Sequence, residues 1–163
     1  METSFTSQDF FKDSEFMLVR QAKSGEAMEP LLATEVHSPL KSFAEHAISL
    51  GHVYSLPDRD GVTRYEYVAL RYGDGYYPSL GLEVARLYLD LPGERMALSL
   101  GEGVCLGDFL IPTDQKARML PNFIGPERSF PYVSAVDVIE QRIPCRYVSR
   151  KGGHYRNSGT RHL

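Results

Sequence analysis

The stretch Leu91–Leu120, LPGERMALSLGEGVCLGDFLIPTDQKARML, decides the fold class of this chain. Apolar side chains alternate with other residues over Met96–Leu100 and again over Val104–Leu106, and glycines separate the two runs. Together with the Gly107-Asp108 turn, this pattern is typical of the short strands of a small barrel or sandwich. The stretch holds no nucleophile beside a base, no metal-ligand spacing and no phosphate-binding loop, so we expect it to build the fold.

Further strand patterns lie on both sides of this stretch. Alternation, or a short apolar run between turn residues, predicts strands at Phe16–Gln21, Leu31–Val36, Tyr65–Leu70, Val84–Leu91, Tyr132–Ile139 and Arg142–Val148. One helix is predicted between Ser38-Pro39 and Gly51, because a capping serine and a proline precede apolar residues at helical spacing. We therefore predict a mainly all-β fold, a small β-barrel or β-tulip-like domain with one short helix and extended N- and C-terminal arms.

The composition is that of an ordinary globular domain. Of the 163 residues, 42% are hydrophobic and 24% are charged, which is neither a disordered nor a membrane-spanning composition. We expect an N-terminal arm over residues 1–15, a β-rich domain over 16–148 and a basic tail over 149–163. No apolar run approaches the roughly 18 residues that a membrane span needs, and the start has no secretory signal. These features predict synthesis in the cytoplasm and no membrane partner.

Charge is unevenly distributed along the chain. The last 22 residues carry six cations and no acid, whereas the net charge of the whole chain is -3, so the preceding residues carry -9. A tail of this kind predicts contact with an acidic surface. Nucleic acid is a disfavoured partner, because the acidic body would repel it.

No motif for catalysis or cofactor binding is present, so we expect no enzyme activity and no cofactor. Three histidines, His37, His46 and His52, are spaced nine and six residues apart, which matches no zinc pattern, and we expect no metal. The Asp58–Gly61 segment is interpreted as a turn, since it lacks the carboxylates that calcium needs at both ends of its loop. Two cysteines, Cys105 and Cys145, are predicted to be buried thiols, and whether they pair stays open.

Residues of the opening stretch resemble a known family. Leu91–Arg95, the alternating run that follows, Gly101–Val104 and Gly107–Leu110 resemble a segment of tailed-phage capsid decoration, or cement, proteins. Tyr132–Glu140 and Arg146–Val148 resemble later strands of the same family. The resemblance covers roughly residues 62–148 and consists of turns and strands, with no catalytic residues to carry over.

The resemblance implies a structural virion protein that binds the outer surface of an assembled capsid. Its partners would be the major capsid protein and neighbouring copies of itself, at three-fold or quasi-three-fold positions. The alternatives are a head-completion or tail accessory protein, and a non-viral protein-binding module. Contacts are expected in the arms and in the proline-rich loop Pro121–Pro131. The candidate contact residues are Phe5, Phe10, Phe11, Phe123, Ile124, Phe130, Arg150, Lys151, Arg156 and Arg161.

Overall fold

The computed structural model describes residues 14–21, 29–126, 129–130 and 132–143. The chain divides into two compact units, Met1–Asn122 and Phe123–Leu163. The boundary falls within the predicted Pro121–Pro131 loop, whose described residues form no helix or strand. The predicted mainly-β class is confirmed, and the described strands form three sheets with no closed barrel.

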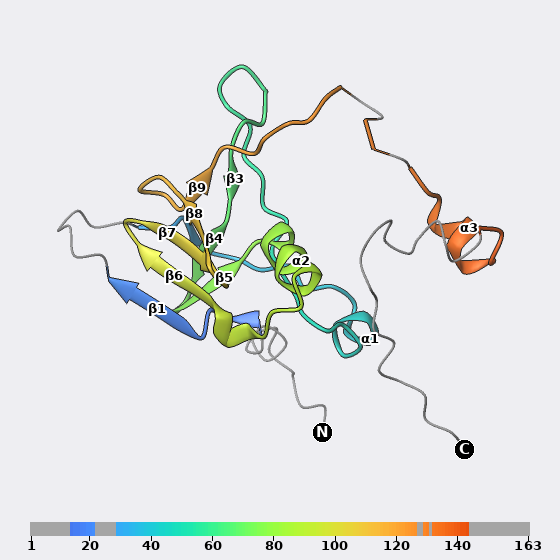
Figure 1. The fold of residues 1–163 in the computed structure, drawn as a ribbon, viewed down its shortest axis with the longest axis horizontal. Coiled ribbons are helices and arrows are strands. Elements are labelled where there is room, and N and C mark those ends of the chain that lie inside the picture. The colour runs from blue at the N-terminus through green and yellow to red at the C-terminus, as the bar shows by residue number, and fades with distance from the viewer. Residues whose placement is uncertain (1–13, 22–28, 127–128, 131, 144–163) are drawn as a thin grey trace. The chain divides into compact units, whose positions relative to one another are not determined.

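The largest sheet is built from the opening stretch. Its strand order is β1-β6-β7-β8, and β1 runs parallel to β6 whereas the other pairs are antiparallel (Figure 1). The bounds are β1 Leu18–Gln21, β6 Met96–Leu100, β7 Gly103–Leu106 and β8 Phe109–Pro112. Leu106 pairs with Phe109 across the predicted Gly107-Asp108 turn, and Gly107 has a φ of +61°, which favours glycine. The strands and the turn predicted here are confirmed.

Two smaller sheets complete the first unit. One has the order β2-β4-β5, with bounds Leu32–Ala33, Ala69–Tyr72 and Gly75–Pro78. The other pairs β3, Glu66–Tyr67, with β9, Arg118–Met119. The predicted strand at Leu31–Val36 is therefore reduced to two residues, and the run from Tyr65 to Leu70 is divided between two sheets.

The hydrophobic core of the first unit lies against β6 and β7. Leu98 and Val104 face each other across these strands and are completely buried. All five residues of β6 are buried, because β6 lies between β1 and β7 and is covered on both faces. The other buried members of the core are Phe16, Val68, Ala69, Leu82, Met96, Leu100, Leu106 and Ala117.

A helix occupies a segment for which a strand was predicted. The Val84–Leu91 prediction is wrong, because α2 spans Leu80–Tyr88. Ser79 caps this helix by accepting a hydrogen bond from the Leu82 backbone N–H, 3.2 Å away. Leu87 and Leu89, which alternation placed on a buried strand face, are each 41% exposed. The short 3₁₀ helix η2, Gly93–Arg95, then leads into β6.

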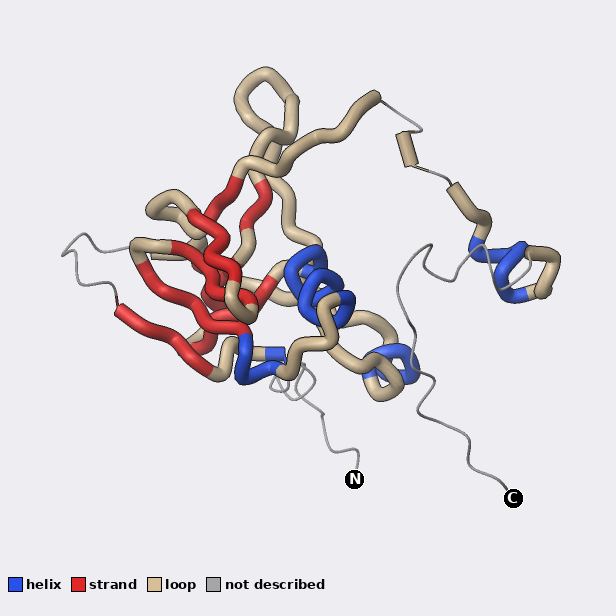
Figure 2. The backbone as a smooth tube through the Cα atoms, viewed as in Figure 1, coloured by secondary structure: helices blue, strands red, loops and turns tan. Residues whose placement is uncertain are grey.

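The predicted N-terminal helix is much shorter than expected. Only α1, Lys41–Ala44, is helical, and of the expected apolar face Ala44 is buried whereas Phe43 and Ile48 are exposed. Figure 2 shows that the connection between β2 and β3 is otherwise loop. Among the residues that the structure describes, no helix has the length and apolar character needed to cross a membrane.

The second unit holds a single described helix, α3, Ala135–Ile139. The prediction of a strand at Tyr132–Ile139 is therefore wrong. Arg142 stabilises the helix end by contacting the carboxylates of Asp137, at 3.0 Å, and of Glu140. Most of the predicted strand Arg142–Val148, with Cys145, lies outside the described residues, and Cys105 is a free thiol.

Candidate functional site

A pocket of about 580 Å³ lies in the first unit. One wall is the sheet β2-β4-β5, which contributes Ala33, Leu70, Tyr72 and Tyr77. The other wall is the connection on either side of α1, residues 35–39 and 50–54. Figure 1 shows α1 between β2 and β3 along the chain. Pockets for small molecules typically have volumes of about 300–1,000 Å³ and mostly apolar walls, so this one has the size and character of a ligand site.

The Gly51-His52 pair is fixed by the end of β5 and the start of α2. The His52 backbone N–H donates to the Pro78 carbonyl at 3.0 Å, and its carbonyl accepts from the Leu80 N–H at 2.8 Å. A Cβ on Gly51 would lie 2.6 Å from the Leu80 backbone, so only glycine permits this approach. The histidine side chain is therefore held at a defined place in the pocket wall.

A second anchor holds the same segment at Leu50. Its backbone N–H donates to the Ser14 hydroxyl at 2.8 Å, and Ser14 is itself buried. Both residues line the pocket. The loop wall is thus attached at two nearby positions, Leu50 and His52, to residues far away in the sequence, which makes the pocket a preformed part of the fold.

Aromatic side chains form much of the sheet wall. The rings of Tyr72 and Tyr77, on the paired strands β4 and β5, meet edge to face with centroids 6.4 Å apart. Burial, followed by the nearby charges of Glu15 and Tyr72, raises the pKa of Tyr77 above its usual value. The Tyr77 phenol is therefore neutral near pH 7, and both rings offer apolar surface to the pocket.

His52 carries an unsatisfied buried nitrogen. Its Nδ1 accepts a long hydrogen bond, 3.4 Å, from the Tyr54 backbone N–H. Its Nε2 is buried, and no described residue bonds to it. Burial lowers the pKa of His52 from 6.5 to about 4, so the ring is neutral at physiological pH. Because a backbone N–H can only donate, Nδ1 is the acceptor and the ring proton resides on Nε2.

Ser38 is the second pocket residue with an unsatisfied polar atom. Its hydroxyl oxygen is buried without a partner among the described residues. Buried polar groups in folded proteins are nearly always paired, and leaving one unpaired costs roughly 1–3 kcal/mol. Both atoms are enclosed by the surrounding residues and are not exposed to the pocket.

Stability should depend on pH through His52. Its pKa is about 4 in the folded chain and 6.5 in the unfolded one, so the unfolded state binds more protons between these values. This contribution is complete above pH 6.5 and is lost as the pH falls toward 4, to a limit of about 3 kcal/mol. The free energy of unfolding is measured in urea at pH 7.5 and at pH 4.5. Between these values it should fall by up to about 3 kcal/mol more in wild type than in His52→Gln.

The matched control for this measurement is His46→Gln, which removes an exposed histidine outside the pocket. Its loss of stability on acidification should follow that of wild type. Equal losses in wild type and His52→Gln would mean that the His52 ring is not buried as a neutral group.

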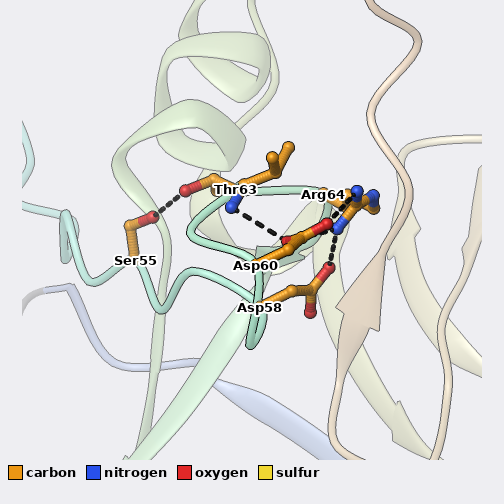
Figure 3. Close-up of polar contacts among 6 residues, drawn as sticks. Ser55, Asp58, Asp60, Thr63 and Arg64 are labelled. Atoms are coloured by element: carbon orange, nitrogen blue, oxygen red, sulfur yellow. Dashed lines mark hydrogen bonds and ion pairs between the residues drawn. The ribbon is translucent and has the colours of Figure 1, made fainter.

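The acidic pair Asp58 and Asp60 lies outside the pocket and has a structural role. Arg64 donates to Asp58 at 2.8 Å and to both oxygens of Asp60 at 2.9 and 2.6 Å (Figure 3). The hydrogen bond from Arg64, followed by that from the Val62 backbone, lowers the pKa of Asp60. The predicted turn is confirmed, with a φ of +80° at Gly61, and the carboxylates serve to close it.

The predicted contact residues that the structure describes do not line the pocket. Phe123, Ile124 and Phe130 are exposed and belong to the second unit. The remaining candidates lie outside the described residues: Phe5, Phe10, Phe11, Arg150, Lys151, Arg156 and Arg161. That these side chains contact a neighbour stays a prediction.

Two of the three histidines considered for metal, His37 and His52, line the pocket, whereas His46 does not. The structure shows no group of metal ligands among the described residues. His37 and Glu35 are exposed, and Nε2 of His37 lies 3.9 Å from Oε1 of Glu35. The signal for the site in the sequence was Gly51-His52, a glycine that permits close packing next to a titratable side chain.

Comparison with protein-family models decides the family. The model of the CHASE2 domain matches residues 4–157, nearly the whole chain. The chain belongs to the CHASE2 domain family. Comparison of this CHASE2 domain with curated proteins and with solved structures gave no match.

The family overturns the resemblance to phage decoration proteins. CHASE2 domains are extracellular sensory domains of signalling proteins, typically modules of membrane receptors. The predictions of a capsid-binding or other virion protein, of a major capsid protein and neighbouring copies on a shell as partners, and of a place on the virion after synthesis in a host cytoplasm are therefore wrong. The turns that carried the resemblance have a geometric cause, since Gly103 and Gly107 of this CHASE2 domain both have positive φ.

Proposed function

We propose that this chain is the sensory domain of a signalling protein and that it recognises a small molecule in the pocket between the sheet β2-β4-β5 and the α1 connection. Membership of the CHASE2 family supports the sensory role. The observation that carries the choice of site is the pocket of about 580 Å³, whose lining is mostly apolar and whose loop wall is held through Leu50 and His52. On this account the domain faces the extracellular medium, binds its ligand without transforming it and is not an enzyme.

Ligand binding in the pocket can change the conformation of the loop wall, as a sensor requires. The loop wall contains only one short helix, and it is attached to the rest of the unit through Leu50 and His52. A molecule that fills the pocket contacts residues on either side of α1. Such a ligand favours one arrangement of the loop over others, and this differential binding is the requirement for a population shift.

Filling the pocket should abolish ligand binding. Ala33→Leu adds three carbons at a pocket-lining position on β2, whereas Ala47→Leu makes the same change at an exposed position outside the pocket. Thermal unfolding of the 163-residue chain is measured against a library of small molecules. A ligand at about 100 times its Kd stabilises by about 2.7 kcal/mol, which raises the Tm by roughly 5–10 °C.

We expect such a shift in wild type and in Ala47→Leu, and less than a fifth of it in Ala33→Leu. A ligand that stabilises all three proteins equally would bind elsewhere and would refute this site. Unfolding of each variant without ligand controls for a loss of the fold itself.

A further inference from the structure

The sheet wall of the pocket is a continuous apolar surface. Ala33 pairs with Tyr72 across β2 and β4. Leu70 pairs with Tyr77 across β4 and β5. Residues that pair directly share a face of a sheet, as do residues two apart on one strand, so the four side chains lie on the same face. All four line the pocket, and together they present two aromatic rings, an isobutyl group and a methyl group.

The loop wall adds aliphatic surface and no unpaired polar group that a ligand reaches. Val36, Pro39 and Leu50 of this wall line the pocket. The two polar atoms without a partner among the described residues, His52 Nε2 and Ser38 Oγ, are enclosed by the protein. A ligand therefore gains its affinity from buried apolar surface, which contributes about fourfold for each CH₂ group.

An ionised ligand finds no compensating charge in this pocket. Among the described residues that line it, none is a lysine or an arginine. The side chains of Glu35 and His37 are 77% and 89% exposed, so both groups are hydrated. An ion pair with a group this exposed changes an affinity by less than about fivefold. An ion inside the pocket would lose its own hydration without an equal gain.

The volume of the pocket sets the size of the ligand. An apolar cavity of about 150 Å³ holds one benzene molecule. At the same packing, a pocket of about 580 Å³ accommodates roughly 20 non-hydrogen atoms. Sugars, nucleotides and amino acids carry several polar or ionised groups within this size, and an apolar lining leaves such groups without partners.

We infer that the pocket takes an uncharged, apolar small molecule of up to roughly 20 non-hydrogen atoms, held by apolar contact with the sheet wall. This inference rests on the proposed sensory function of the same pocket. It goes further by naming the class of ligand, which includes hydrocarbons and aromatic compounds and excludes organic acids, amines and sugars.

Alkylbenzenes and their polar analogues test this ligand class. Ethylbenzene, propylbenzene and butylbenzene differ by one methylene group each. Benzylacetone, hydrocinnamate and phenylpropylammonium are close to butylbenzene in size and carry a ketone, a carboxylate and an ammonium group. Each probe is titrated into the ¹⁵N- and methyl-labelled 163-residue chain at pH 7.5. The Gly51 amide signal and the methyl signals of Leu50 and Leu70 report on the pocket.

We expect the affinity to rise about fourfold with each methylene group from ethylbenzene to butylbenzene. Benzylacetone should bind more weakly than butylbenzene, because its carbonyl loses hydration and gains no partner. Hydrocinnamate and phenylpropylammonium should each bind at least about tenfold more weakly than butylbenzene. Every probe that binds should move the signals of Gly51, Leu50 and Leu70.

Glu35→Lys tests why the ionised probes are excluded. This variant places a cation at an exposed position in the pocket lining. Hydrocinnamate should gain less than about fivefold in affinity and should still bind more weakly than butylbenzene. The control is Glu45→Lys, the same change of charge at an exposed residue outside the lining, which should leave every affinity as in wild type.

Four outcomes would overturn the inferred ligand class. These are tighter binding of benzylacetone or of an ionised probe than of butylbenzene, no rise in affinity along the alkylbenzene series, no binding of any alkylbenzene up to its solubility limit, and a preference of Glu35→Lys for hydrocinnamate over butylbenzene. If the pocket signals move in the first case, the pocket remains a ligand site and only its chemistry changes. Failure of the proposed function would be recognised separately, by ligands of the library that stabilise Ala33→Leu as strongly as wild type.

Discussion

Arg86→Met should lower the free energy of unfolding by about 3–5 kcal/mol. The Glu83 and Arg86 side chains of α2 are only 4% and 11% exposed, and the guanidinium contacts Oε2 of Glu83 at 2.8 and 2.9 Å. It also donates to the Leu91 carbonyl at 2.8 Å, which closes the end of the helix. Removing the arginine leaves a buried carboxylate without its cation. Urea unfolding followed by circular dichroism measures the loss.

The double variant Glu83→Leu, Arg86→Met tests whether the unpaired buried charge causes this loss of stability. It removes both charges and keeps apolar volume, so it should regain most of the stability lost in Arg86→Met. A control is Arg64→Met, which breaks an exposed pair and should change stability by less than about 1 kcal/mol. If the double variant is no more stable than Arg86→Met, the loss arises from the Leu91 contact and not from the buried charge.

Gly103→Ala should destabilise the fold by roughly 2–6 kcal/mol. Gly103 begins β7 with a φ of +144°, which a residue with a side chain adopts only under strain of about 1–3 kcal/mol. A Cβ there would overlap the carbonyl oxygen of Ile111 on β8, and relieving this overlap costs a further 1–3 kcal/mol or so. Because Gly103 pairs with Pro112 across β7 and β8, the substitution destabilises the largest sheet.

Gly73→Ala is the control for Gly103→Ala, because it introduces backbone strain without steric overlap. Gly73 has a φ of +58° in the β4–β5 turn, and a Cβ there would meet nothing within 4 Å. This variant should lose only about 1–2 kcal/mol, the typical strain of a left-handed residue. A loss in Gly103→Ala no larger than that in Gly73→Ala would show that β8 moves away from β7 at little cost.

The β6-β7-β8 part of the largest sheet was predictable because the residues that form it are neighbours in the sequence. Alternation over β6 and β7 and the Gly107-Asp108 turn lie within one short stretch, and the structure confirms them. The helix α2 was missed because its apolar residues fit an alternating and a helical period equally well. Ser79 distinguishes a helix from a strand here, because a serine at this position caps a helix.

The pocket could not be predicted, because its walls come from distant parts of the chain. Ser14 meets Leu50, and His52 lies between Pro78 and Leu80, through backbone contacts that no sequence motif records. The family was misjudged for a related reason. Glycine-rich turns are required by tight hairpins in many β proteins, so their pattern indicates geometry more than descent.

Intermolecular nuclear Overhauser effects test the ligand site most directly. The strongest ligand of the library is bound to the methyl-labelled 163-residue chain, and contacts from its protons to leucine and valine methyl groups are recorded. The pocket account predicts contacts to Leu50 and Leu70, which line the pocket. Contacts to Val84 and Leu87 alone, two exposed apolar side chains of α2, would contradict it.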